Sequence, residues 1–215
     1  MNYLAHLFLS RPTVGGWVGA LWPDMAGRRA TLPDDADVAE AAEHHRLVDR
    51  LTDVHAGHHR ARQRLFADQG RFAGVVADVV ADHVLSRQWP AWSDQRPFAS
   101  TPATREQFIE TVERGLAQGH PLMPAPMQRV VERMTAGRWL WMYADLDGLE
   151  RVLWMMSQRF TQRFGRRVQL GSAVAVVERD YAGFAEDFEL LMPALIQAVR
   201  EAGDDPANPQ PGGTL

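Results

Sequence analysis

The segment from Asp37 to Leu85 contains no proline and repeats apolar residues at three- and four-residue spacing. That spacing lies along one face of an α-helix, whereas the two-residue alternation of a half-buried strand is hard to find anywhere. Gly57 and Gly70 are candidate interruptions. Two rows carry the pattern: Leu47, Val48, Leu51 and Val54, then Phe72, Val75, Val76, Val79, Val80 and Leu85. The sequence therefore predicts an all-α fold.

The rest of the chain favours the same fold class. Prolines and glycines punctuate residues 11–35, which predicts short helical turns alternating with loops. Further helices are expected near residues 104–117, 127–135, 138–144, 146–163 and 172–201. With no repeat and no linker, we expect one helical-bundle catalytic domain over residues 1–202. Residues 203–215 hold three prolines and two adjacent glycines, which predicts a disordered tail.

Composition narrows the chemistry. The chain has 215 residues and no cysteine, which excludes disulfides, thiolate zinc sites and cysteine nucleophiles. All 23 basic side chains are arginines, so P-loop lysines and Schiff bases are excluded as well. A net charge of −4 gives no general attraction to nucleic acid or to an anionic membrane. The apolar N-terminal run is too short to span a bilayer, and we expect a cytoplasmic protein.

Seven of the eight histidines lie in the first 83 residues, interleaved with aspartates. Imidazole and carboxylate groups together bind borderline or hard divalent cations without sulfur. On a helix, His45, Asp49 and Asp53 form one row at four-residue spacing. Asp78 and Asp82 form a second row, with His83 adjacent, and His6 and Asp24 could join from the N-terminal segment. The pattern predicts a divalent metal site between helices.

Each of these residues also has a simpler structural interpretation. A His–Asp pair four residues apart is more often a surface hydrogen bond than a pair of ligands. His6 lies in an apolar run and fits a buried core histidine, and Asp24 fits a helix N-cap. It is the clustering of several candidates in one half of the chain that favours the metal site.

Four segments of the N-terminal part follow one another in a specific order. They are Met1-Asn2-Tyr3-Leu4-Ala5-His6-Leu7, then Gly19…Asp24…Gly27, then His45-Arg46-x-x-Asp49-x-x-x-Asp53, then Asp78-x-x-x-Asp82-His83-x-Leu85-x-x-x-Trp89. Together they resemble the acyl carrier protein phosphodiesterase family, an all-helical relative of the HD-type metal-dependent phosphohydrolases. Trp139-x-x-x-Tyr143 and Ser157-x-Arg159 also look like features of that family.

The resemblance implies hydrolysis of the phosphodiester that links 4′-phosphopantetheine to the serine of holo-acyl carrier protein, with Mn²⁺ or another divalent ion (Mg²⁺, Fe²⁺ or Co²⁺). The expected metal ligands are His6, Asp24, His45, Asp82 and His83. The expected catalytic residues are Asp24, Asp49, Asp78 and Arg46, with Asp49 and Asp78 orienting ligands or moving protons. Arg46 or Arg87 could bind phosphate, and His44 or His55 could act as the general acid.

The implied protein substrate is acidic, so arginine patches should meet it. The candidate patches are Arg28-Arg29, Arg60/Arg62/Arg64 and Arg159/Arg163/Arg166/Arg167. Six residues rich in methionine and tryptophan could line a groove for the pantetheine arm, although such residues more often form the core: Met123, Met127, Met134, Trp139, Trp141 and Trp154.

Two other functions remain open. An HD-type phosphohydrolase acting on a nucleotide or another small phosphoester would use the same metal site. A non-catalytic helical interaction module would use the histidines and aspartates only as a polar network, and would bind no stoichiometric metal.

Overall fold

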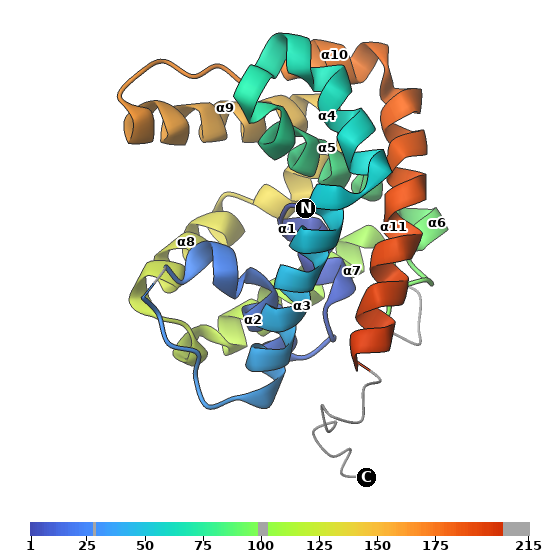
Figure 1. Ribbon diagram of the computed structural model, residues 1–215. Helices are drawn as coiled ribbons and strands as arrows, with labels where there is room; N and C mark the ends of the chain where they lie inside the picture. The colour runs from blue at the N-terminus through green and yellow to red at the C-terminus, as the bar shows by residue number, and fades with distance from the viewer. Residues whose placement is uncertain (28, 99–102, 204–215) are drawn as a thin grey trace.

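The computed structural model describes residues 1–27, 29–98 and 103–203, and within these ranges the chain forms helices and no strand (Figure 1). The α-helices are α1 Tyr3–Leu9, α2 Val14–Met25, α3 Ala36–Val54, α4 Ala56–Gln69, α5 Ala73–Arg87, α6 Trp89–Trp92, α7 Arg105–Gln118, α8 Ala125–Ala136, α9 Leu146–Phe164, α10 Ala173–Arg179 and α11 Tyr181–Gly203. Three 3₁₀ helices are η1 Gly70–Phe72, η2 His120–Leu122 and η3 Trp139–Ala144. The predicted all-α class is confirmed.

The short helix α1 lies inside the molecule, and all of its residues from Leu4 to Leu9 are buried. It contacts α2, α5 and α11, and α2 packs along α3. The long helix α11 runs down one side of the bundle, against α3, α4 and α5 (Figure 1). His6 on α1 is thus carried into the interior, beside the helix that bears His45 and Asp49.

Side-chain caps fix where the main helices begin. The Thr13 side chain accepts a hydrogen bond from the Gly16 N–H, and Asp35 accepts one from Val38, each at 3.0 Å. Asp145 does the same for α9, accepting from Gly148 at 2.7 Å. Each cap satisfies a backbone N–H that the first turn of a helix leaves without a partner. At the other end of α9, Gly165 adopts a φ of 63°, a conformation that favours glycine.

Most predicted helices are confirmed within a few residues, and three expectations about their boundaries were wrong. Residues 11–35 include a 12-residue helix, α2, with Pro23 inside it near its end. The break before α4 falls at His55 rather than at Gly57, whereas Gly70 does end a helix, with a φ of 50°. The helix expected over 172–201 divides at Asp180, where the backbone leaves helical geometry.

Two expectations concern the ends of the chain and the membrane. Residues 204–215 of the predicted disordered tail lie outside the described residues, and Gly203 is the last residue of α11. Among the described helices, none combines the length and the apolar character needed to cross a membrane.

Candidate metal centre

Two histidines and an aspartate, one from α1 and two from α3, meet in the interior of the bundle. The His6 and His45 rings stack, with centroids 3.7 Å apart and planes 12° from parallel. Asp49 follows His45 by one helical turn, so its carboxylate reaches both rings. Its Oδ1 lies 3.2 Å from His6 Nε2 and its Oδ2 lies 3.1 Å from His45 Nε2. One ligand atom from each residue lies within 4.8 Å of the other two, so the three could hold one metal ion.

The hydrogen bonds of His45 leave its Nε2 facing a carboxylate. Its Nδ1 lies 2.7 Å from the Ala20 carbonyl oxygen, and because a carbonyl only accepts, Nδ1 carries the hydrogen. The remaining nitrogen then points a lone pair at Asp49, and two acceptors at that separation need a proton or a metal ion between them. An imidazole held through its other nitrogen by a carbonyl is the usual setting of a metal ligand.

The charge states of the other two groups fit a divalent cation. The pKa of His6 is lowered to about 4, chiefly by burial and in part by His45 and the Met1 amino group, against the opposing effect of Asp49. The ring is therefore neutral near pH 7. Burial raises the pKa of Asp49, but the nearby His45 and His6 rings and the Met1 amino group outweigh it and hold this pKa well below its usual range. A neutral imidazole and an ionised carboxylate are suitable ligands for Mn²⁺, Mg²⁺, Fe²⁺ or Co²⁺.

Asp24 lies at the edge of this cluster. It sits near the end of α2, with Oδ1 3.8 Å from His45 Nε2. Burial raises its pKa, and Asp49 raises it further, while His45 partly opposes the shift. Asp24 and Asp49 line the same cavity, together with Asp53 and Asp78. The cluster is therefore reached from a solvent-connected cavity whose wall is rich in carboxylates.

Asp78 joins the cluster through the amino group of Met1. Its Oδ1 lies 3.2 Å from that nitrogen and 3.1 Å from His58 Nε2, while Asp49 Oδ1 lies 3.5 Å from the same amino nitrogen. Burial lowers the pKa of the amino group, but Asp78 and Asp49 outweigh this and raise it. The pKa of Asp78 is lowered despite burial, because the amino group and His58 stabilise its anion.

Asp82 and His83, two of the expected ligands, lie outside the cluster. Asp82 accepts backbone hydrogen bonds from Leu4 at 2.7 Å and Ala5 at 3.0 Å, and so holds the first turn of α1. His83 Nδ1 lies 2.9 Å from the Tyr143 carbonyl oxygen, to which it donates. Neighbouring residues on a helix point about 100° apart, so Asp82 and His83 face different surroundings.

The remaining predicted residues also lie away from the cavity. Arg46 pairs with Glu43 on the exposed side of α3. His44 stacks on Phe98, with ring centroids 5.8 Å apart, and His55 caps α4 by accepting from the Gly57 N–H at 3.1 Å. Arg87 lies over the Tyr181 ring, 5.1 Å from its centroid. None of these four residues is among those that line the cavity over the cluster.

Tyr3 and Arg159 were not predicted as site residues, yet both line the cavity over the cluster. Burial raises the pKa of Tyr3, Asp24 raises it further, and the positive charge of Arg159 partly offsets the shift. Arg159 was predicted only as part of an arginine patch, because its place on α9 is far along the chain from the histidines. The motif Ser157-x-Arg159, which resembles the family, was the sequence signal that could have identified Arg159 as a site residue.

Fold and site together define an all-helical protein with a candidate centre for a divalent metal ion. The family model described as acyl carrier protein phosphodiesterase matches residues 1–195, well beyond the N-terminal segments that carry the resemblance in the sequence. This chain therefore belongs to the acyl carrier protein phosphodiesterase family.

Curated relatives agree with that membership. The proteins of Yersinia enterocolitica and Serratia proteamaculans are 28% and 29% identical over 201 residues, which is 94% of this chain and 98% of each relative. The protein of an Enterobacter species is 30% identical over 159 residues, 74% of this chain and 79% of the relative. All three are named acyl carrier protein phosphodiesterase. No solved structure matches the chain, so the relation to HD-type phosphohydrolases stays a prediction from the sequence.

Proposed function

We propose that this protein hydrolyses the phosphodiester of holo-acyl carrier protein, giving apo-acyl carrier protein and 4′-phosphopantetheine. Family membership supports the reaction. The observation that carries the proposal is the His6–His45–Asp49 cluster beside a cavity whose wall contains Asp49 and further carboxylates. Water attacks phosphorus and the bond to the serine oxygen breaks, so one proton leaves the water and one reaches the serine.

In this proposal His6, His45 and Asp49 hold the divalent cation, and Asp24 contributes from the edge of the cluster. Asp82 and His83 are left out of the ligand set, because both carboxylate oxygens of Asp82 accept backbone hydrogen bonds and neither residue is among the three whose ligand atoms meet in the cluster. A bound divalent ion, of which Mn²⁺ is our first choice, supplies positive charge against the phosphate and lowers the pKa of water. The Ala20 carbonyl keeps Nε2 of His45 aimed at the cation.

Asp24 is the proposed proton carrier. Its carboxyl is 43% exposed at the cavity and burial raises its pKa, which makes it a better proton acceptor than an ordinary aspartate. Asp78 is a proposed positioning residue, because it fixes the amino group of Met1 beside Asp49. His44 and His55 are not assigned as the general acid, since both contact other parts of the protein.

The end of α9 is the proposed surface for the acidic carrier protein. Three arginines are exposed there: Arg163, Arg166 and Arg167. They come shortly after Arg159 in the sequence, and Arg159 itself lines the cavity. Charges of opposite sign would steer the two proteins together.

The other predicted patches are less suitable. Arg60 and Arg64 of the second patch both bind Asp187, with their Nε atoms 2.6 and 2.9 Å from its carboxylate oxygens. Of the first patch, Arg29 is exposed and Arg28 lies outside the described residues.

Mass spectrometry of holo-acyl carrier protein tests the reaction. Incubation with the protein and Mn²⁺ should convert the holo form to the apo form, and Asp49→Asn should abolish the conversion. His59→Gln, which changes an exposed histidine outside the cluster, is the matched control and should convert like the unmodified protein. Intact holo protein across several divalent ions would refute the proposal, and phosphate release from nucleotides instead would favour the small-phosphoester alternative.

A further inference from the structure

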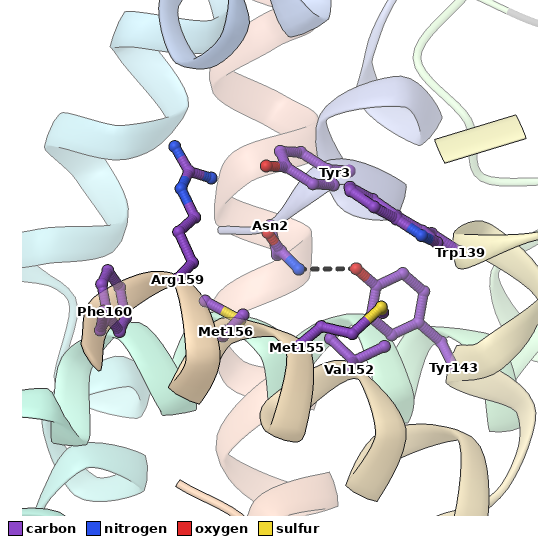
Figure 2. A pocket seen from close by; sticks show the side chains of 9 residues that line it. All are labelled: Asn2, Tyr3, Trp139, Tyr143, Val152, Met155, Met156, Arg159 and Phe160. Carbon is purple, nitrogen blue, oxygen red and sulfur yellow. Dashed lines mark hydrogen bonds between the residues drawn. The ribbon is translucent and has the colours of Figure 1, made fainter. Parts of the chain in front are cut away.

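A second pocket lies beside the cavity over the cluster, between the start of the chain, η3 and α9 (Figure 2). It encloses about 550 Å³, including its open mouth. Tyr3, Met156 and Arg159 line both this pocket and the cavity over the cluster, so the two spaces share a wall. A ligand with its reactive group at the cluster could therefore extend into the pocket without leaving the protein.

The two ends of the pocket differ in chemistry. Figure 2 shows Arg159 at one end and Trp139 with Tyr143 at the other, where Asn2 Nδ2 donates to the Tyr143 hydroxyl at 2.7 Å. Between them the wall is apolar and flexible, formed largely by the side chains of Val152, Met155 and Met156. Methionine side chains adapt their shape to a bound chain, and the polar atoms of the wall can bind amides.

Arg159 is suited to bind an anion at the mouth. Its side chain is exposed, it shares the wall of both spaces with Tyr3, and among the described residues no carboxylate lies within ion-pair distance of it. It also lines the same cavity as the carboxylates of Asp24, Asp49 and Asp78. A guanidinium group binds phosphate oxygens through two parallel hydrogen bonds.

We propose that this pocket receives the pantetheine arm of the substrate and that Arg159 binds the phosphate between the pocket and the cluster. The proposal rests on the proposed function, which makes the ligand a phosphate joined to a flexible chain with two amides and a thiol. That order of groups matches the pocket: the anion meets Arg159, the chain lies along Met155 and Met156, and the thiol end reaches Trp139. Arg159 is thus a substrate-binding residue, in the place that the sequence assigned to Arg46 or Arg87.

Calorimetry with two free ligands separates the parts of the pocket. The probes are 4′-phosphopantetheine and pantetheine, which lacks the phosphate, with the full-length protein in Mn²⁺. Arg159→Gln should weaken binding of 4′-phosphopantetheine by about tenfold or more and change pantetheine binding less than about twofold. Met155→Trp, which fills the pocket, should weaken both ligands by about tenfold or more. Arg151→Gln, an exposed arginine elsewhere on α9, is the matched control and should bind both like the unmodified protein.

The outcomes separate this inference from the proposed function. If the protein converts holo-acyl carrier protein but neither variant changes binding, the pocket assignment is wrong and the function stands. If conversion fails while the two ligands still bind with this dependence on Arg159 and Met155, the pocket assignment stands and the reaction is wrong. Since Arg159 is exposed, its variant should fold even if Met155→Trp does not. Equal weakening of both ligands by Arg159→Gln would overturn the phosphate-binding role.

Discussion

Replacing Gly19 with alanine should disturb the packing that forms the candidate metal centre. A Cβ at Gly19 would lie 2.7 Å from the Ala41 Cβ and closer still to the Val38 carbonyl oxygen, both on α3. Ordinary contact begins at 3.4 Å, so α2 and α3 would have to separate by about 0.7 Å or more. The carbonyl that orients His45 belongs to Ala20, the next residue, so the same shift should move the ligand.

The expected size follows from two opposing effects. Overpacking costs roughly 1–3 kcal/mol, and a clash with backbone atoms that cannot rotate away belongs in the upper part of that range, about 2–3 kcal/mol. The better helix propensity of alanine returns about 1 kcal/mol. We therefore expect a loss of about 1–2 kcal/mol in the free energy of unfolding, or about 2–8 °C in melting temperature for a chain of this size. Because a displaced Ala20 carbonyl no longer fixes His45, affinity for Mn²⁺ should fall by about tenfold.

Urea denaturation and Mn²⁺ titration measure the two effects on the same sample. Gly74→Ala is the matched control: a Cβ there would meet Arg62 Nε at 3.5 Å, an ordinary contact, so this change should be neutral or stabilise the protein by about 0.5 kcal/mol. If Gly19→Ala unfolds at the same urea concentration and binds Mn²⁺ as tightly as the unmodified protein, our reasoning about the α2–α3 contact is refuted.

Two further predictions concern buried carboxylates. Burial raises the pKa of Asp82 in the folded protein to about 7, whereas its pKa in the unfolded chain is near 4. The neutral carboxyl therefore contributes its full stability below about pH 4, and this contribution is lost as the pH rises through about 7. In metal-free buffer the unmodified protein should therefore lose more stability between pH 4.5 and pH 8 than Asp82→Asn does, and equal losses in urea denaturation would contradict the assignment. Asp187 is 2% exposed and binds Arg60 and Arg64 between α4 and α11. Asp187→Asn should therefore lower the free energy of unfolding by about 2–3 kcal/mol in the same assay. A change below about 0.5 kcal/mol would show that the ion pairs contribute little.

The helices that were predictable are those whose apolar periodicity is long. The spacing around Leu47 and Val79 identified α3 and α5 because each buries one face against neighbours. The helix α2 was missed because its glycines resemble loop residues. In the structure Gly15 and Gly19 instead allow α2 to approach α3 more closely than any side chain would permit. Single-sequence periodicity does not distinguish a glycine that breaks a helix from one that packs it.

The division between α10 and α11 had no local signal. Asp180 ends α10, and the Arg64 side chain on α4 pairs with it. A break stabilised by a residue more than a hundred positions away depends on tertiary contacts, which the apolar pattern of 172–201 does not reveal.

In the candidate site, the sequence was most informative within single helices. The four-residue spacing of His45 and Asp49 indicated that both would lie on one face of a helix, and in the structure His45 Nε2 lies 3.1 Å from Asp49 Oδ2. Which other residues join them depends on how helices meet. His6 joins because α1 is buried beside α3, whereas Asp82 was expected as a ligand and instead holds the start of α1.

Mn²⁺ binding tests most directly whether His6, His45 and Asp49 form a metal centre, because the proposed function requires a cation at this cluster. Purified, chelator-treated protein should bind Mn²⁺, and an ion at a hundred times its dissociation constant should raise the free energy of unfolding by about 2.7 kcal/mol. His6→Gln and Asp49→Asn should each remove this stabilisation, while His59→Gln should retain it. No Mn²⁺ binding by the unmodified protein, or full stabilisation of both cluster variants, would contradict the assignment of the metal centre.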